Sequence, residues 1–422
     1  MTSPHPRAAV AAALLAAALL LLTVAPAPAA EPPELWPADQ REFLLDGPAW
    51  LLPEAERAAL AEMPEAERAA FIEEFLSAGP MPGVTPAELA EAIRRRRALV
   101  RSAFLSPADV RARLLFLHGA PAERLIIDCA ATFQPLELWA WATGDATDPE
   151  AREEILVFRP GPSRPWKVWT PVDGKRPLYT GEMEYYLEQW EANDGRLWTA
   201  ERFDLQSCPE TPRVDRVTRI RALHVYLKGR PTAAEFLSWL EPPGDLARWV
   251  KEAAETPLHD GPPPLDTSPV EVLFPGTAGQ RLIARFQLRV PQAWELPTAP
   301  SSAFEEEEEV RLVVEGVVEE GGRGFEDLRV RFVLPPPPEG KPLVLVFEEP
   351  LRPRQEYLIR LRVRDEISGR SAYLVQGFRV PDRPQEVALP PPPEEAIVSI
   401  GRALARQEIT GEDSLLLVPP AA

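Results

Sequence analysis

Histidine and cysteine are the residues whose chemistry is easiest to detect by spacing, and this chain has few of either. Its 422 residues include four histidines and two cysteines. His118, His224 and His259 lie far apart, and none has a second histidine or cysteine at the spacing of a zinc site. Motifs for a nucleophilic serine, a phosphate loop and a dinucleotide fold are also missing from the sequence. We therefore predict no catalytic, metal-binding or cofactor-binding residue and no cofactor, and we interpret His118 as structural.

The two cysteines, Cys129 and Cys208, are candidates for a disulfide bond. They would close a loop of about 80 residues, which stabilises a folded chain by roughly 4–5 kcal/mol in the loop-entropy picture. The bond requires an oxidising compartment. Two buried free thiols are the alternative that the sequence leaves open.

Tryptophan is concentrated in the middle of the chain, where six of the 11 residues lie between Trp139 and Trp198. Aromatic ring faces suit sugar rings, so this region is a candidate for carbohydrate binding. Core packing is the commoner role of tryptophan. Exposure of the rings distinguishes the two roles. The candidate stacking residues are Trp139, Trp141, Trp166 and Trp169.

The charge balance excludes two classes of partner. The chain has 65 acidic and 46 basic side chains, a net charge of −19. Because no basic surplus is present to neutralise phosphates, the sequence argues against nucleic acid and against anionic lipid. Four consecutive arginines, Arg94–Arg97, are the main local exception. Consecutive residues fan around a helix, so we expect them to be solvated and paired with neighbouring glutamates.

The first 30 residues have the pattern of a secretory signal peptide. Arg7 supplies the positive region, Ala8–Ala25 is apolar, and Ala27-Pro28-Ala29 is a cleavage signal of small residues. An uncleaved anchor is the alternative that the length of the apolar run leaves open. No later run is long enough to span a membrane. We expect a periplasmic or extracellular protein with no membrane span once the leader is removed.

Residues 31–110 are predicted to be helical. Pro53 and Pro64 each precede an acidic, alanine-rich segment, so one short helix should end where the next begins. Thr85-Pro86-Ala87-Glu88 is a capping box for a helix that should run to about Phe104.

Residues 111–258 are predicted to form a tryptophan-rich α+β region. Leu114–Leu117 is a short apolar run ending at Gly119 and predicts a buried strand. The other expected strands are Leu138–Trp141, Glu154–Phe158 and Trp166–Trp169. The expected helices are Glu182–Trp190, Val217–Leu227, Ala233–Leu240 and Asp245–Ala254.

A proline-rich linker, 259–268, precedes the clearest pattern in the chain. Seven short apolar or alternating runs follow within about 110 residues and are separated by turn signals. This spacing predicts an antiparallel β-sandwich of the immunoglobulin or fibronectin III type over residues 269–383, followed by a proline-rich tail, 384–422. The seven runs are Val270–Phe274, Leu282–Val290, Val310–Val314, Leu328–Leu334, Leu343–Phe347, Tyr357–Val363 and Tyr373–Val380. The predicted fold class is therefore α+β, with a helical segment and a mixed α/β region before the sandwich.

Three segments resemble the bacterial GWxTD domain family. They are a glutamate-rich helix at Glu67–Phe75, an Arg-x-Arg segment at Arg111–Pro121, and Pro135–Trp141 with its Glu-x-Trp-x-Trp pattern. The motif that names the family is absent, because Ser106–Val110 stands in its place without the glycine and tryptophan. The resemblance covers about residues 50–170 and implies an exported bacterial protein with no established activity. It supplies no catalytic residue.

These observations favour an exported, non-catalytic binding or assembly module of the bacterial envelope. Its partner would be an envelope protein that binds the β-sandwich. The alternative is an envelope polymer hydrolase or a carbohydrate-binding protein that uses the tryptophan-rich middle region.

Overall fold

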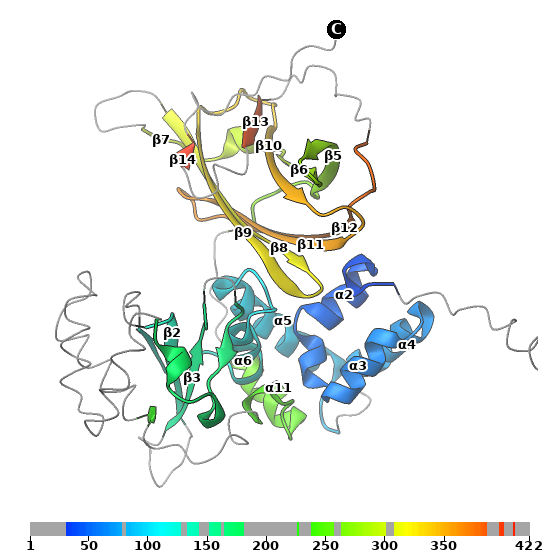
Figure 1. Ribbon diagram of the computed structural model, residues 1–422, viewed down its shortest axis with the longest axis vertical. Coiled ribbons are helices and arrows are strands. Elements are labelled where there is room, and N and C mark those ends of the chain that lie inside the picture. Colours follow the sequence, from blue (N-terminus) through cyan, green and yellow to red (C-terminus); the bar gives the residue numbers. More distant parts are fainter. Residues whose placement is uncertain are drawn as a thin grey trace, which may run out of the picture.

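The computed structural model describes two parts, one of helices and a small sheet and one of larger sheets (Figure 1). The described residues are 31–77, 82–127, 133–142, 152–161, 164–180, 226–227, 238–256, 263–300, 308–385, 396–400 and 408–409. The leader, both cysteines, the expected helix Glu182–Trp190 and most of the expected helices Val217–Leu227 and Ala233–Leu240 lie outside these residues. The fold is a mixed α+β one, as the sequence predicts at this level.

The N-terminal helices begin where the prolines and the capping box indicate. Pro53 is the N-cap of α3 and Pro64 that of α4, so the predicted division at Pro64 is confirmed. At the start of α5, the Glu88 backbone N–H donates to Thr85 Oγ1 at 3.2 Å, and the Glu88 carboxylate accepts from the Thr85 backbone N–H at 2.8 Å. The segments are η1 (Pro33–Leu35), α2 (Ala38–Leu45), η2 (Pro48–Leu51), α3 (Glu54–Glu62), α4 (Glu65–Leu76) and α5 (Pro86–Ala103).

The strand expected at Leu114–Leu117 is wrong, because these residues belong to helix α6 (Val110–His118). Asp109 caps its start by accepting the Arg111 N–H at 2.9 Å, and Gly119 ends it with a φ of +80°. All four apolar residues of the run are buried. A short helix covered on all sides lacks an amphipathic period, so its sequence is indistinguishable from that of a buried strand.

A four-stranded antiparallel sheet follows, in the order β1-β2-β3-β4. Its strands are β1 (Glu123–Ile127), β2 (Leu136–Ala142), β3 (Arg152–Phe158) and β4 (Lys167–Val168). The last three match expected strands, whereas β1 was not predicted. Short 3-10 turns η3 (Pro171–Asp173), η4 (Arg176–Leu178) and η6 (Ser238–Leu240) precede α11 (Leu246–Ala254), which the sequence predicts. One hydrophobic cluster joins the helices to this sheet.

All seven apolar runs of the C-terminal region are strands. β5 (Glu271–Ala278), β6 (Arg281–Val290) and β10 (Leu343–Leu351) form one antiparallel sheet. β8 (Glu308–Glu320), β9 (Arg323–Leu334), β11 (Glu356–Asp365) and β12 (Ser371–Arg379) form a larger one, which curls like half of a barrel (Figure 1). Three short strands complete the sheets: β7 (Ala299–Pro300) on β8, β13 (Ala396–Ile400) on β10 and β14 (Glu408–Ile409) on β9.

The two C-terminal sheets share one hydrophobic core. Alternate residues of β6 point into it and are buried, as the alternation predicts. Phe286 of β6 stacks on Phe347 at 5.2 Å between ring centroids and meets Phe378 of the larger sheet edge-on at 5.6 Å. The two sheets therefore pack face to face through this core.

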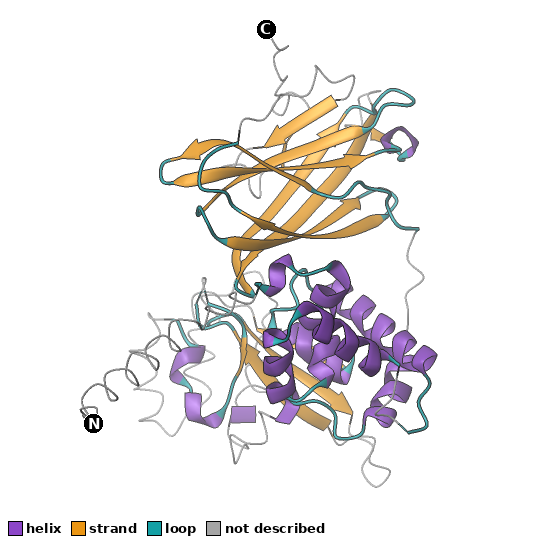
Figure 2. Cartoon of the chain, turned by 90° about the vertical axis from the view of Figure 1, so that its right-hand side faces the viewer, coloured by secondary structure: helices purple, strands orange, loops and turns teal. Residues whose placement is uncertain are grey.

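The outer face of the larger sheet rests on the N-terminal helices (Figure 2). The segment η1 contacts β11 and β12 directly. Within the described part of the chain, no helix is long and apolar enough to cross a membrane.

Candidate functional site

The surface where the larger sheet meets the helices carries a row of three arginines on β11. Arg360, Arg362 and Arg364 alternate with Leu361 and Val363, which point into the C-terminal core. Because successive residues of a strand face opposite sides, the three guanidinium groups share the outer face. We call these three residues the arginine row.

Arg360 is the buried end of the arginine row. Its side chain is 1% exposed and forms ion pairs with Asp46, the C-cap of α2, and with Glu319 of β8, at 3.1 Å for the latter. Both carboxylates are almost completely buried as well. Burying charges is costly unless they are paired and hydrogen-bonded, and here one cation lies between two anions.

Helix α5 adds two more cations to Asp46. Arg101 Nη2 lies 3.2 Å from an Asp46 carboxylate oxygen, and Arg97 Nη2 lies 3.5 Å from the same oxygen. Arg97 also pairs with Glu42 of α2 at 2.5 Å. Asp46 is therefore the anion on which three arginines converge, two from α5 and one from β11.

These contacts set the titration of Asp46 and Arg360. Burial alone would raise the pKa of Asp46, but Arg360, Arg101 and Arg97 outweigh it and hold that pKa below its ordinary value. Burial would lower the pKa of Arg360, but Glu319 and Asp46 raise it above its ordinary value. The shifts in both pKa values favour the charged forms of Asp46 and Arg360 at neutral pH.

Three hydrogen bonds tie the sheet to the last turn of α5 and the loop after it. Arg362 donates to the backbone carbonyl of Arg101. The Tyr373 hydroxyl of β12 donates to the Leu105 carbonyl at 2.7 Å, and the Ser106 hydroxyl donates to Glu319. The two parts are thus fixed by directional polar contacts as well as by burial.

The arginine run in α5 only partly follows its prediction. Arg94 and Arg95 do pair with Glu91, at 2.7 Å and 2.5 Å, but only Arg94 is exposed, since Arg95 is half-buried and also donates to the Thr256 carbonyl at 3.0 Å. Arg96 does not pair with Glu91, because it is 3% exposed and burial lowers its pKa to about 10. Its Nη1 donates to the carbonyl of Leu115 at 3.5 Å.

Arg97 differs from the prediction in another way. It is paired with a glutamate, but that glutamate belongs to α2, so Arg97 ties helices together. The fan of consecutive residues around a helix was correctly expected, and it explains the result. Since α5 has neighbours on several sides, a fan of arginines reaches solvent, the core and the junction at once.

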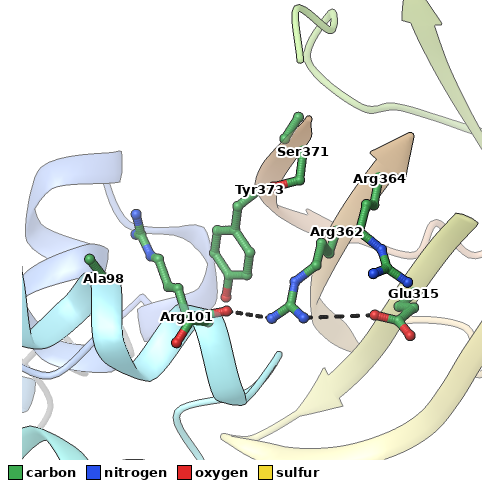
Figure 3. A pocket seen from close by; sticks show the side chains of 9 residues that line it. Ala98, Arg101, Glu315, Arg362, Arg364, Ser371 and Tyr373 are labelled. Atoms are coloured by element: carbon green, nitrogen blue, oxygen red, sulfur yellow. Dashed lines mark hydrogen bonds and ion pairs between the residues drawn. The ribbon is translucent and has the colours of Figure 1, made fainter. Parts of the chain in front are cut away.

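An open pocket of about 580 Å³ lies beside this ion network (Figure 3). Its walls come from α5 and from the outer faces of β8, β11 and β12. Three arginines and one glutamate supply the charges, so an anion is the ligand that the lining favours. The lining residues are Ala98, Arg101, Ser102, Glu315, Arg362, Arg364, Ser371, Ala372 and Tyr373.

The four candidate stacking tryptophans do not form one exposed platform. Trp139 and Trp169 are buried, at 1% and 3% exposure, and belong to the core of the N-terminal part. Trp141 and Trp166 are half-buried. Trp141 packs at 4.9 Å from Trp239, and the Arg111 guanidinium lies 3.7 Å above the Trp166 ring.

His118 is held by its surroundings at the end of α6. Its Nε2 lies 2.8 Å from the backbone carbonyl of Trp239, and its ring packs against Trp239 and Trp141. Among the described residues, no group of three or more histidine, cysteine or acidic side chains is placed to hold a metal ion. Cys129 and Cys208 lie outside the described residues, so the predicted disulfide remains a prediction.

Residues from two of the three segments quoted for the family resemblance meet in a second ion cluster, around the buried Glu137. Glu137 accepts from Arg111 at 2.6 Å, from Arg124 at 2.6 Å and from the Trp139 indole at 2.7 Å. Burial would raise the pKa of Glu137, but these partners lower it below its ordinary value. This cluster ties α6 to β1 and β2.

Comparison with protein-family models and with curated proteins found no match. The fold and the site define an α+β protein in which a buried ion network joins C-terminal antiparallel sheets to N-terminal helices. Its function has to be inferred from its own residues.

We expect the junction to weaken in acid because the pKa of Asp46 is lowered in the folded protein. Its stabilising contribution is fully present above the ordinary carboxyl pKa of about 3.9 and is lost as the pH falls through the lower folded-state value. Urea unfolding measured from pH 7 down to pH 2 should show this loss. The Asp46→Asn variant should have a flatter profile, and parallel profiles for the two proteins would contradict the assignment.

Proposed function

We propose that the chain is an exported, non-catalytic binding or assembly module of the bacterial envelope, and that its C-terminal sheets form an immunoglobulin or fibronectin III-like sandwich that binds a protein partner. The observation that carries this proposal is the strand order. β10 returns to pair with β6 after β8 and β9 have formed the opposite sheet, and β11 then pairs with β8. The chain thus crosses between the sheets three times, from β6 to β8, from β9 to β10 and from β10 to β11, which is a Greek-key feature of such sandwiches.

A tyrosine at the entrance to β11 supports the same class of domain. Tyr357 is completely buried, and its hydroxyl accepts the backbone N–H of Arg352 at 3.3 Å, five residues upstream. Immunoglobulin-type sandwiches have a tyrosine corner of this kind at the turn between the corresponding strands. Sandwiches of this class occur in many cell-surface proteins, where loops and strand edges contact partners.

Tyr357→Phe tests the tyrosine corner. The ring remains while the hydroxyl is lost, so we expect the free energy of unfolding to fall by about 1 kcal/mol. Urea denaturation followed by tryptophan fluorescence measures the change. Tyr373→Phe is not a suitable control because that hydroxyl belongs to the junction. An unchanged midpoint for Tyr357→Phe would show that the hydroxyl is not a structural part of the corner.

The junction supports a binding role in a second way. A sandwich fixed by Asp46, Arg360 and Glu319 presents its free loops in a constant orientation to the N-terminal part. Rigid presentation lowers the ordering cost of binding. One free loop carries Pro335–Pro338 and Glu339 between β9 and β10 and is largely exposed.

We also propose that residues 111–258 are a diverged GWxTD-like region. The support is the cluster around Glu137, because Arg111 and Trp139 both donate to Glu137 and all three come from the quoted segments. This proposal includes export by a cleaved signal peptide and a periplasmic or extracellular location. It assigns no activity.

The test is capture of a partner by the mature chain, residues 31–422, from envelope extract of its own host. Acidic side chains are abundant, at 65 in the sequence, so a carboxylate-reactive cross-linker will sample the whole surface. We expect a stoichiometric protein cross-linked to residues 263–385. Cross-links confined to residues 31–256 would overturn binding through the sandwich.

Two further outcomes would also contradict the proposal. Retention by envelope polysaccharide, abolished by Trp141→Ala, would favour the carbohydrate-binding alternative. Failure to enrich any protein after washing with salt would contradict the assembly role and favour screening for hydrolase activity.

A further inference from the structure

The arginine row changes from fully paired to unpaired along β11. Arg360 has two buried carboxylate partners. Arg362 has one ion-pair partner, Glu315, at 3.7 Å, and also donates to the Arg101 carbonyl. The Arg364 side chain is exposed and, among the described residues, has neither an ion-pair nor a hydrogen-bond partner. The unpaired end of the row is the end that lines the pocket.

The pocket is therefore positively charged in a strongly acidic chain. Its three arginines face a single lining carboxylate, Glu315, which also lies 3.3 Å from Arg329 outside the pocket. Arg101 has Asp46 behind it, but that carboxylate is shared with Arg360 and Arg97. With a net charge of −19 overall, a local cationic surplus is unexpected unless an anion binds there.

The geometry suits a compact, doubly charged oxyanion. Arg362 and Arg364 are two residues apart on one strand face, a separation of about 7 Å along the strand. Arg101 comes from α5, and its guanidinium lies over the Tyr373 ring at 4.8 Å from the ring centroid, on the side of Tyr373 away from Arg362 and Arg364 (Figure 3). In the register of β11 and β12, Ser371 lies opposite Arg364 and adds a hydroxyl to the lining.

We propose that this pocket binds a phosphate group, either inorganic phosphate or the phosphate of a small ester. Arginine forks match phosphate oxygens, and a surplus of two positive charges in the lining matches a dianion better than a single carboxylate. The pocket volume leaves room for an organic group beyond the phosphate. The ligand would contact α5 and β11 together, so its binding would strengthen the junction.

This site is independent of the proposed partner-binding role. The sandwich could bind its partner without the pocket being occupied, and phosphate could bind without a partner. The experiment below therefore tests the pocket alone.

The test is calorimetric titration of residues 31–422 with inorganic phosphate and with glycerol 3-phosphate, at constant ionic strength held by sodium chloride. We expect saturable binding of at least one of the two and a rise in the thermal unfolding midpoint with that ligand. Tighter binding of the ester would indicate an organic phosphate as the ligand. Tighter binding of inorganic phosphate would indicate the free anion.

Arg364→Gln is the decisive variant, with Arg379→Gln as its matched control. Both remove one exposed guanidinium from the larger sheet, but Arg379 lies at the far end of β12 and pairs with Glu356. We expect the affinity to fall about tenfold or more in Arg364→Gln and to be unchanged in Arg379→Gln. Because the Arg364 side chain has no partner among the described residues, its variant should fold with an unchanged midpoint in the absence of phosphate.

Three results would overturn the proposal. One is an absence of saturable binding by either phosphate compound. Another is an equal stabilisation by sodium chloride at the same ionic strength. The third is the same affinity for phosphate in wild type and Arg364→Gln.

Discussion

Asp46→Asn is expected to lower the free energy of unfolding by about 3–5 kcal/mol, the cost typical of removing one partner from a buried ion pair. The amide keeps the size of the carboxylate but removes its charge. Arg360, Arg101 and Arg97 would then face a neutral group, and only Glu319 would remain to neutralise the buried Arg360. Urea denaturation followed by tryptophan fluorescence and circular dichroism measures the loss.

Asp39→Asn is the matched control for this experiment. Asp39 lies in the same helix, α2, and is exposed to solvent. Removing its charge should change the free energy of unfolding by no more than about 0.5 kcal/mol. If Asp46→Asn and Asp39→Asn were equally stable, the network would contribute nothing to the junction, and the fixed orientation of the sandwich would lose its support.

The strands of the C-terminal region were predictable because most of them alternate or have turns at their ends. β6 is the clearest example, since its alternate apolar residues are those that the core buries. The turn between β8 and β9 was equally predictable from its two glycines. Gly321 and Gly322 adopt φ values of +57° and +70°, which glycine favours. These signals depend only on neighbouring residues, so they can be identified from the sequence alone.

The junction was not predictable, because its residues look like solvated ones. An arginine on the polar face of a strand is normally exposed, and the pattern of β11 says nothing about a helix that covers it. Asp46 and Arg360 are separated by more than 300 positions, and only the fold brings them together. The one signal that could have drawn attention was the Arg-x-Arg-x-Arg repeat at alternate positions of a predicted strand.

The N-terminal segment shows the same limit in another form. Its helix starts follow from prolines and a capping box, which are local. Its attachment to the sheet depends on Gly377, which lies opposite Leu358 in the strand register. From the sequence alone, a glycine in the middle of a strand predicts weakness or a bulge. In the structure, it makes room for another part of the chain.

Gly377→Ala is therefore expected to destabilise the protein, although alanine fits a strand backbone better than glycine does. An added Cβ would lie 1.7 Å from the Glu34 carbonyl oxygen and 2.9 Å from its carbonyl carbon, both backbone atoms of η1. Neither atom can move without lifting η1 from β12. We expect a loss of about 3 kcal/mol in the free energy of unfolding, at the upper end of the cost of overpacking.

Gly324→Ala separates the effect of the contact from the effect of replacing a strand glycine. Gly324 lies in β9, and a Cβ there would meet only Val317 Cγ2 at 3.7 Å, an ordinary contact. Its variant should be neutral or slightly more stable, because alanine restricts the unfolded chain. Acrylamide quenching supplies a second measurement, because Trp36 is 1% exposed next to η1 and should become accessible in Gly377→Ala alone. If both glycine variants were equally stable and equally protected from quenching, η1 would not be docked on β12 and would have no part in covering the buried end of the arginine row.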